Sequence, residues 1–203
     1  MRLLKFLVAS AAVVVTAVTI APRAEASLIM TLEQVGSNVV ATGSGSIDTT
    51  ALSLLASNAG SSWGIAPYRS YLIVGAPATV NEYGYISGPT SFGSGTGANP
   101  DTESGDIFGL FAYNGQIYIE APNAYLSGAA LKGSSTWNAT TLSALGVTTG
   151  TYTWNWGTGT HADSLTLYAG VAAPAPAGAA TPVPEPSSLA IFGTALAALG
   201  LLL

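Results

Sequence analysis

The chain has 203 residues, no cysteine, one histidine and a formal net charge of −5, and only 7% of its residues are charged. Five basic residues cannot neutralise a track of phosphates, so a nucleic-acid partner is not expected. One histidine without cysteine cannot supply the usual zinc ligands, no other cofactor is indicated, and disulfides are excluded.

A secretory signal peptide is predicted for residues 1–26. Arg2 and Lys5 precede an apolar run over residues 6–20, which is short for a membrane span and makes an uncleaved anchor the weaker alternative. A small-x-small cleavage site follows. Its two small residues and the first residue after the cut are Ala24, Ala26 and Ser27.

The body predicted between the targeting segments is residues 27–171, close to the commonest size of a single domain. Cleavage after residue 26 leaves nine acidic residues and two basic ones, Arg69 and Lys132, a net charge of −7. Hydroxyl and amide side chains must therefore form most of the wet surface.

The first half of the body contains short β-prone runs. Residues 30–35 and 39–42 flank a Gly-Ser-Asn turn and predict an opening hairpin. Residues 47–55 suit a strand end followed by a short helical turn. Residues 71–74 predict a buried strand and residues 83–86 a weaker one.

Residues 88–106 are too rich in glycine, proline, serine and aspartate for regular structure, and predict a long loop. Its Gly93–Gly97 run lacks the lysine and the following helix of a phosphate loop. The next segment predicts a hairpin, because Asn114-Gly115 accommodates the positive φ angles of a type I′ turn. Ile117 and Ile119 then share a core face. Gln116, Tyr118 and Glu120 share the opposite face.

Residues 138–145 predict one or two helical turns, ended by Gly146. Residues 151–156 alternate polar and aromatic side chains, and a Gly-Thr-Gly-Thr turn leads to residues 164–167, which predicts a second hairpin. The hairpin spacing favours an all-β fold, an antiparallel β-sandwich or jelly-roll-like domain.

Tyr152, Trp154 and Trp156 lie on one face of this strand and allow two interpretations. An aromatic row at the surface stacks on sugar rings. The simpler interpretation is that the row points into the core, because the opposite face carries threonine and asparagine.

Catalytic and metal sites have weak support. His161, Asp163 and Ser164 are the residue types of a triad, but neighbours in one turn rarely attain its geometry and no G-x-S-x-G elbow occurs. The carboxylates of the long loop are candidates for a Ca²⁺ site, and together with Glu120 for a glycosidase pair, although a solvated acidic loop is the simpler account. They are Asp101, Glu103 and Asp106.

The C-terminal part changes composition. Residues 172–183 are rich in proline and alanine and predict an extended spacer. Pro184-Glu185-Pro186 then prevents a helix, and residues 189–203 form a run without charge, about 22 Å long as a helix at roughly 1.5 Å per residue. This run is shorter than the roughly 30 Å hydrocarbon layer of a bilayer.

The order spacer, Pro-Glu-Pro and apolar run resembles the PEP-CTERM sorting signal of exported bacterial proteins, here over residues 184–203. The segments VGSNVVATGSGSID and GTYTWNWGTGTHADSLTLYAG are similar to uncharacterised members of that group. One departure is that the family's tail closes with arginines, whereas these residues end in three leucines. The resemblance implies recognition by an exosortase, transient membrane contact as an anchored precursor, and delivery to the cell envelope, outer surface or extracellular matrix.

The sequence thus predicts an all-β domain flanked by an N-terminal signal helix and a C-terminal apolar helix. The function expected first is that of a non-catalytic exported surface or matrix protein, associated with biofilm polysaccharide. The alternatives are a carbohydrate-binding module at the cell surface and a secreted hydrolase. Because the body has few lysines, its sheet edges are poorly protected against pairing with another chain, and self-association is a further hypothesis.

Overall fold

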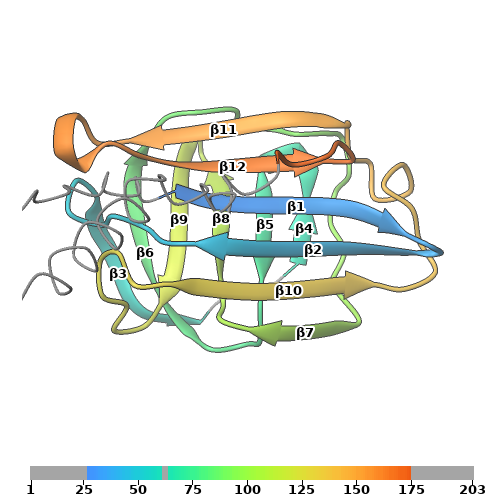
Figure 1. Cartoon of the computed structure of the whole chain (residues 1–203), viewed down its shortest axis with the longest axis horizontal. Coiled ribbons are helices and arrows are strands. Elements are labelled where there is room, and N and C mark those ends of the chain that lie inside the picture. The colour runs from blue at the N-terminus through green and yellow to red at the C-terminus, as the bar shows by residue number, and fades with distance from the viewer. Residues whose placement is uncertain (1–26, 61–63, 175–203) are drawn as a thin grey trace, which may run out of the picture.

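The computed structural model describes residues 27–60 and 64–174 of the chain. Within these residues the protein is mostly β-structure, with twelve strands arranged in two six-stranded sheets (Figure 1). Two single-turn 3-10 helices, η1 (Pro67–Arg69) and η2 (Gly159–His161), lie in connections. The all-β prediction is therefore confirmed for the described part of the chain.

The first sheet has the order β11-β12-β1-β2-β10-β7. Its strands are β1 (Ser27–Val35), β2 (Asn38–Gly45), β7 (Thr102–Gly105), β10 (Leu131–Trp137), β11 (Gly150–Trp156) and β12 (Asp163–Ala169). The second sheet has the order β3-β6-β9-β8-β5-β4. Its strands are β3 (Ser53–Gly60), β4 (Gly64–Ala66), β5 (Tyr71–Val74), β6 (Thr79–Ile86), β8 (Phe108–Tyr113) and β9 (Gln116–Pro122).

The predicted hairpins are present. β1 pairs antiparallel with β2, and β11 pairs antiparallel with β12. β8 and β9 are joined by Asn114 and Gly115, whose φ angles of 51° and 77° are those of a type I′ turn. The predicted buried strand at residues 71–74 is β5, and all four of its residues are buried.

One pairing differs from the antiparallel expectation. β1 runs parallel to β12, with Ser27 opposite Ser164 and Leu32 opposite Ala169. Parallel neighbours need a crossover between them, and here the crossover is the whole intervening domain. The first and last strands therefore lie side by side in the middle of one sheet, and hairpin signals alone do not predict this pairing.

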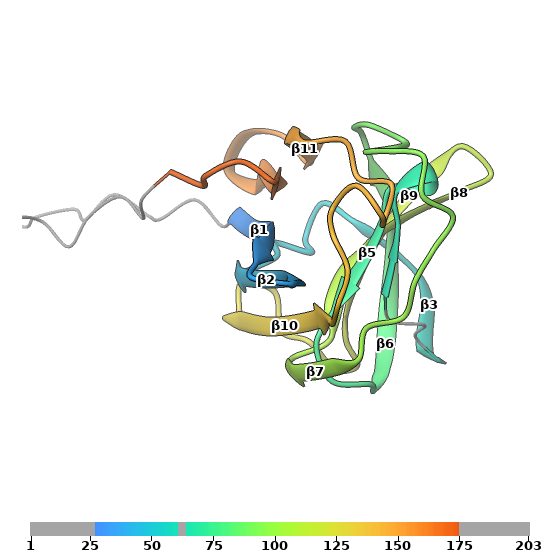
Figure 2. The same ribbon diagram turned by 90° about the vertical axis from the view of Figure 1, so that its right-hand side faces the viewer.

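The core lies between the two sheets. Figure 2 shows them from the side, with β1, β2 and β10 facing β5, β6 and β9. Buried side chains of both sheets form one cluster, which includes Leu28, Met30, Leu72 and Phe108. Gly43 on β2 permits close packing here, because a Cβ at this position would come within 2.6 Å of the Phe108 ring.

Two local predictions were wrong, and one strand was missed. The expected helical turn before Leu55 is instead a loop that leads into β3. The segment expected to be wholly irregular, residues 88–106, contains β7, which pairs with β10. β10 itself was not predicted, because its sequence LKGSSTW has little of the aliphatic content of a strand.

Residues 138–145 form hydrogen-bonded turns, and the bond from the N–H of Leu145 to the carbonyl of Thr141 has the i→i−4 spacing of the one helical turn predicted there. Gly146 ends them with a φ of 66°, as expected for a stop. The predicted signal helix and C-terminal apolar helix lie outside the described residues. Among the described residues, no helix has the length and apolar character needed to cross a bilayer.

Candidate functional site

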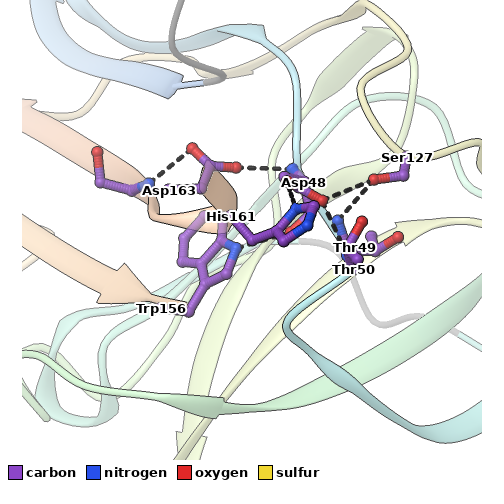
Figure 3. A network of polar contacts seen from close by, with 8 residues as sticks. Asp48, Thr49, Thr50, Ser127, Trp156, His161 and Asp163 are labelled. Carbon is purple, nitrogen blue, oxygen red and sulfur yellow. Dashed lines mark hydrogen bonds and ion pairs between the residues drawn. The ribbon is translucent and has the colours of Figure 1, made fainter. Parts of the chain in front are cut away.

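The connection from β2 to β3 is held by a polar network centred on Asp48 (Figure 3). Oδ1 of Asp48 accepts hydrogen bonds from the N–H of Thr50 at 2.9 Å and the hydroxyl of Ser127 at 3.0 Å. Oδ2 of Asp48 lies 2.9 Å from Nδ1 of His161. The indole N–H of Trp156 donates to the main-chain oxygen of Asp48 at 2.9 Å. The network therefore ties the β2–β3 and β9–β10 connections to the β11–β12 end of the first sheet.

Asp163, the first residue of β12, adds a buried carboxylate to this network, since only 6% of the residue is exposed. Its Oδ2 accepts the backbone N–H of Asp48 at 2.7 Å, and its Oδ1 accepts the backbone N–H of Ser164 at 2.7 Å. Both carboxylate oxygens thus serve main-chain donors, which satisfies the polar groups that the connection would otherwise bury.

The two carboxylates have opposite electrostatic environments. Hydrogen bonding from Thr50, and then from His161, holds the pKa of Asp48 well below its ordinary value. Burial raises the pKa of Asp163 to about 6, against the opposing effect of its two backbone donors. At neutral pH Asp48 is therefore an anion that only accepts hydrogen bonds, which requires Nδ1 of His161 to carry a proton.

The network does not have the geometry of a nucleophilic triad. In a triad the imidazole lies between the hydroxyl and the carboxylate and takes the hydroxyl proton. Here the Asp48 carboxylate lies between Ser127 and His161, and the Ser127 hydroxyl donates to it. The three triad candidates from the sequence, His161, Asp163 and Ser164, do not act together. Asp163 accepts the backbone N–H of Ser164, whereas His161 contacts Asp48.

The aromatic row of β11 faces the core. Trp154 is 0% exposed and Trp156 is 4% exposed. The indole N–H of Trp154 donates to the carbonyl of Pro89 at 2.7 Å. Tyr152 is partly buried, and its ring centroid lies 6.4 Å from that of Trp154. The two tryptophans are thus packing residues, and burial closes their ring faces to a sugar.

A different aromatic row crosses the outer face of the second sheet. The rings of Tyr71 on β5 and Phe111 on β8 have centroids 6.2 Å apart, and those of Phe111 and Tyr118 on β9 stack at 4.9 Å with an interplanar angle of 12°. The neighbouring residues Leu72 and Leu110 point the opposite way, into the core between the sheets.

A pocket of about 370 Å³ lies at the β4 edge of this sheet. It is lined by Ile65 and Ala66 of β4, by residues 96–99, and by Arg69 and Tyr71. Nε of Arg69 and Oη of Tyr71 are both buried without a hydrogen-bond partner among the described residues. Because buried polar groups are nearly always paired, two unpaired atoms on residues that line one pocket mark this place as a candidate binding site.

The loop carboxylates hold the edge strand β7 in place. Asp101 precedes β7 and accepts the N–H of Asn138 at 2.7 Å, and Asp106 follows it and accepts the N–H of Lys132 at 3.0 Å. They lie at opposite ends of a strand that pairs Glu103 with Ser135. Among the described residues, no group of three or more histidine or acidic side chains is arranged to hold a metal ion.

Glu120 lies on the face of β9 opposite Ile117 and Ile119 and is nevertheless buried, with 4% of the residue exposed. It lies on β9 in the second sheet, opposite Glu82 of β6, whereas Asp101, Glu103 and Asp106 belong to the β7 region of the first sheet.

The predicted targeting residues fall largely outside the described part of the chain. Pro184, Glu185 and Pro186 lie beyond residue 174, and Ala24 and Ala26 lie before residue 27. The remaining member of the set, Ser27, is the first residue of β1.

Sequence reasoning missed the Arg69–Tyr71 pocket. One signal was available: Arg69 is one of only two cations in the predicted mature body, and it stands between two tyrosines in the run Tyr68-Arg69-Ser70-Tyr71. The rest of the pocket comes from residues 96–99, which the pairing of Ile65 with Ala98 brings to β4. That contact has no local sequence signature.

Comparison with known proteins gives no assignment: no protein-family model, no curated protein and no solved structure matches this chain.

Proposed function

We propose that the protein is an exported, non-catalytic surface or extracellular-matrix protein, a β-sandwich or jelly-roll-like domain sorted through its C-terminal Pro-Glu-Pro signal. The observation that carries the proposal is that the described part of the chain folds into two packed sheets whose aspartates serve main-chain donors, as in a structural domain.

The parallel pairing of β1 and β12 determines which end of the domain the proposed C-terminal spacer follows. Because Ser27 is opposite Ser164 and Ala169 is opposite Leu32, the domain's first and last strand residues lie at opposite ends of the sheet, about 17 Å apart at roughly 3.3 Å per residue. The spacer proposed at residues 172–183 thus follows the end of the domain that is remote from Ser27.

The non-catalytic role is supported by what the titratable groups do. Asp48, Asp101, Asp106 and Asp163 each accept hydrogen bonds from backbone N–H groups. A carboxylate that accepts backbone N–H groups holds a loop or a strand end in place, which is a structural role.

The proposed partners are the export machinery, an exosortase-type sorting protein during a transient membrane-anchored stage, and extracellular polysaccharide. Self-association is proposed through β3, the outermost strand beside β6, where Leu54 and Leu55 are 54% and 53% exposed. Sedimentation of the full chain in detergent at several concentrations tests this, and a single monomeric species throughout would contradict it.

The test of the main proposal is expression of the full chain in a bacterium that has an exosortase, followed by mass analysis of the surface and medium fractions. We expect an N-terminal peptide that begins at Ser27 and the loss of the C-terminal tail near Pro186. A variant with Pro184, Glu185 and Pro186 changed to alanine should remain in the membrane fraction. An intact tail on the mature surface protein would overturn the sorting proposal.

Carbohydrate binding is the second candidate function. The observation that favours it is the pocket beside Arg69 and Tyr71, with its unpaired polar atoms next to aromatic rings. The β11 aromatic row, the site considered from sequence, does not favour it, because Trp154 and Trp156 are buried.

A further inference from the structure

The pocket at the β4 edge is preformed. Ile65 and Ala98 exchange two backbone hydrogen bonds, of 3.0 and 2.8 Å, and Ala98 also accepts the indole N–H of Trp137 at 3.2 Å. The N–H of Tyr68 donates to the carbonyl of Gly95 at 3.1 Å. Both walls of the pocket are thus fixed by backbone contacts, so a ligand would not have to order them.

The cation of the pocket is held by aromatic rings. The guanidinium carbon of Arg69 lies 4.9 Å from the ring centroid of Tyr71 and 5.8 Å from that of Tyr68. Cation–π contacts at these distances keep the planar group in one orientation. Nε of Arg69 remains a buried donor without a partner among the described residues.

Tyr71 supplies the second unpaired group. The residue is 8% exposed, and its Oη has no hydrogen-bond partner in the described part of the chain. Burial raises the pKa of Tyr71, so the hydroxyl remains protonated and can both donate and accept a hydrogen bond. Thr96 and Asn99 add further polar side chains to the lining, opposite the apolar Ile65 and Ala66.

The chemistry that fits is a ring carrying hydroxyl groups and no charge. Hydroxyls satisfy both a donor such as Arg69 Nε and a donor–acceptor such as Tyr71 Oη, while the C–H faces of the ring pack against apolar and aromatic walls. The volume of about 370 Å³ is at the small end of the range of ligand pockets, roughly 300–1,000 Å³, which suits a unit of monosaccharide size.

Electrostatics disfavours a polyanion. The charges of Arg69 and Glu120 act on the pKa of Tyr71 in opposite directions, so the field at this hydroxyl is not purely that of a cation. The predicted mature chain carries nine acidic residues against two basic ones, which repels anionic polymers at long range.

We propose that this pocket binds one sugar ring of a neutral polysaccharide, with Arg69 and Tyr71 as the hydrogen-bonding residues. The inference rests on the proposed export of the chain, because only an exported domain meets such polymers. The pocket and its polar groups are separate from the Asp48 network and from the β11 tryptophans.

The test uses the full chain purified in a mild detergent, with affinity electrophoresis through dextran, hydroxyethyl cellulose, xylan and galactomannan as the neutral probes and polygalacturonate as the charged one. We expect retardation by at least one neutral polymer and none by polygalacturonate. The variants R69Q and Y71F should each bind about fivefold to tenfold more weakly, the effect of one lost hydrogen bond.

Two matched controls separate the pocket from general effects. K132Q removes the body's other cation, and Y113F removes the hydroxyl of a tyrosine that is 58% exposed. Both should bind as the unmodified chain does. Y71F should also keep or raise the thermal midpoint, because it deletes an unpaired buried hydroxyl. A loss of affinity in a variant that is as stable as the unmodified chain then reports a lost contact with the sugar, and not a damaged fold.

Retardation by no neutral polymer, equal retardation of R69Q, Y71F and the controls, or retardation by polygalacturonate alone would each overturn the inference. The binding assay uses purified protein, so its result does not depend on whether the chain is exported. A failure of binding is therefore distinct from a failure of the export proposal, which is read from the mass of the mature protein.

Discussion

Nδ1 of His161 lies 2.9 Å from Oδ2 of Asp48, although 113 residues separate them in the chain. The contact links the turn before β12 to the connection between β2 and β3. Because Asp48 also accepts from Thr50 and Ser127, its carboxylate organises three separate segments.

Loss of this carboxylate should destabilise the fold. D48A leaves the donors of Thr50, Ser127 and His161 without their acceptor, and we expect a decrease of about 1–3 kcal/mol in the free energy of unfolding. Urea denaturation of the full chain in detergent measures it. The matched control is E33A, which truncates an exposed carboxylate of β1 and should change the value little. Equal midpoints for the two variants would contradict the structural role of Asp48.

Asp163 should give stability an acid-side pH dependence. Burial raises its pKa to about 6, from about 3.9 in an unfolded chain, so the folded state holds the proton more tightly. The stabilisation is full below the unfolded pKa and is lost as the pH rises to about 6. The contribution of Asp48 has the opposite sign. Because its pKa is lowered, the carboxylate stabilises the fold at pH values above the ordinary aspartate pKa, and this stabilisation is lost only on strong acidification.

The measurement is the thermal midpoint between pH 4 and 7 for H161N and for the double variant H161N/D163N, so that the chain's single histidine is absent from both. The decline attributable to Asp163 should disappear in the double variant. D163N should also be less stable overall, because an amide cannot accept from both backbone donors that the carboxylate serves. Parallel pH profiles would refute the assignment.

The β11 row tests the core interpretation directly. W154A removes a side chain that is 0% exposed and should cost about 3–5 kcal/mol of stability, as large-to-small changes in a core do. Y113A, at a position 58% exposed, is the control and should cost far less. If W154A kept the unfolding midpoint and lost polysaccharide retention, the result would contradict core packing and support an aromatic row that stacks on sugar rings.

The β8–β9 turn offers a comparison in which backbone conformation is the main variable. A Cβ added at Gly115 or at Gly60 would meet nothing within 4 Å, but Gly115 has a φ of 77° whereas Gly60 lies outside the positive-φ region. G115A should therefore destabilise by about 1–2 kcal/mol, and G60A should be neutral or stabilise by up to about 1 kcal/mol. Equal effects on the thermal midpoint would argue against the type I′ turn.

Local sequence patterns were sufficient for the hairpins. Asn114-Gly115 predicted the β8–β9 turn because few residues tolerate its φ angles, and the alternation of Thr151–Trp156 predicted both the strand and its buried face. β10 escaped prediction, because the Gly-Ser-Ser of its sequence forms a strand only when β2 and β7 supply the hydrogen bonds on either side.

The sequence by itself determined that the body is β-rich, where its hairpin turns lie, and that core packing was the simpler interpretation for Trp154, because these properties depend on side-chain period and on φ preferences. Only the tertiary structure decided that β1 lies parallel to β12, that His161 meets Asp48, and that residues 96–99 close a pocket beside Arg69 and Tyr71. The reason is physical: such contacts join segments far apart in sequence, and they form only when burial of a shared core offsets the entropy of closing long loops.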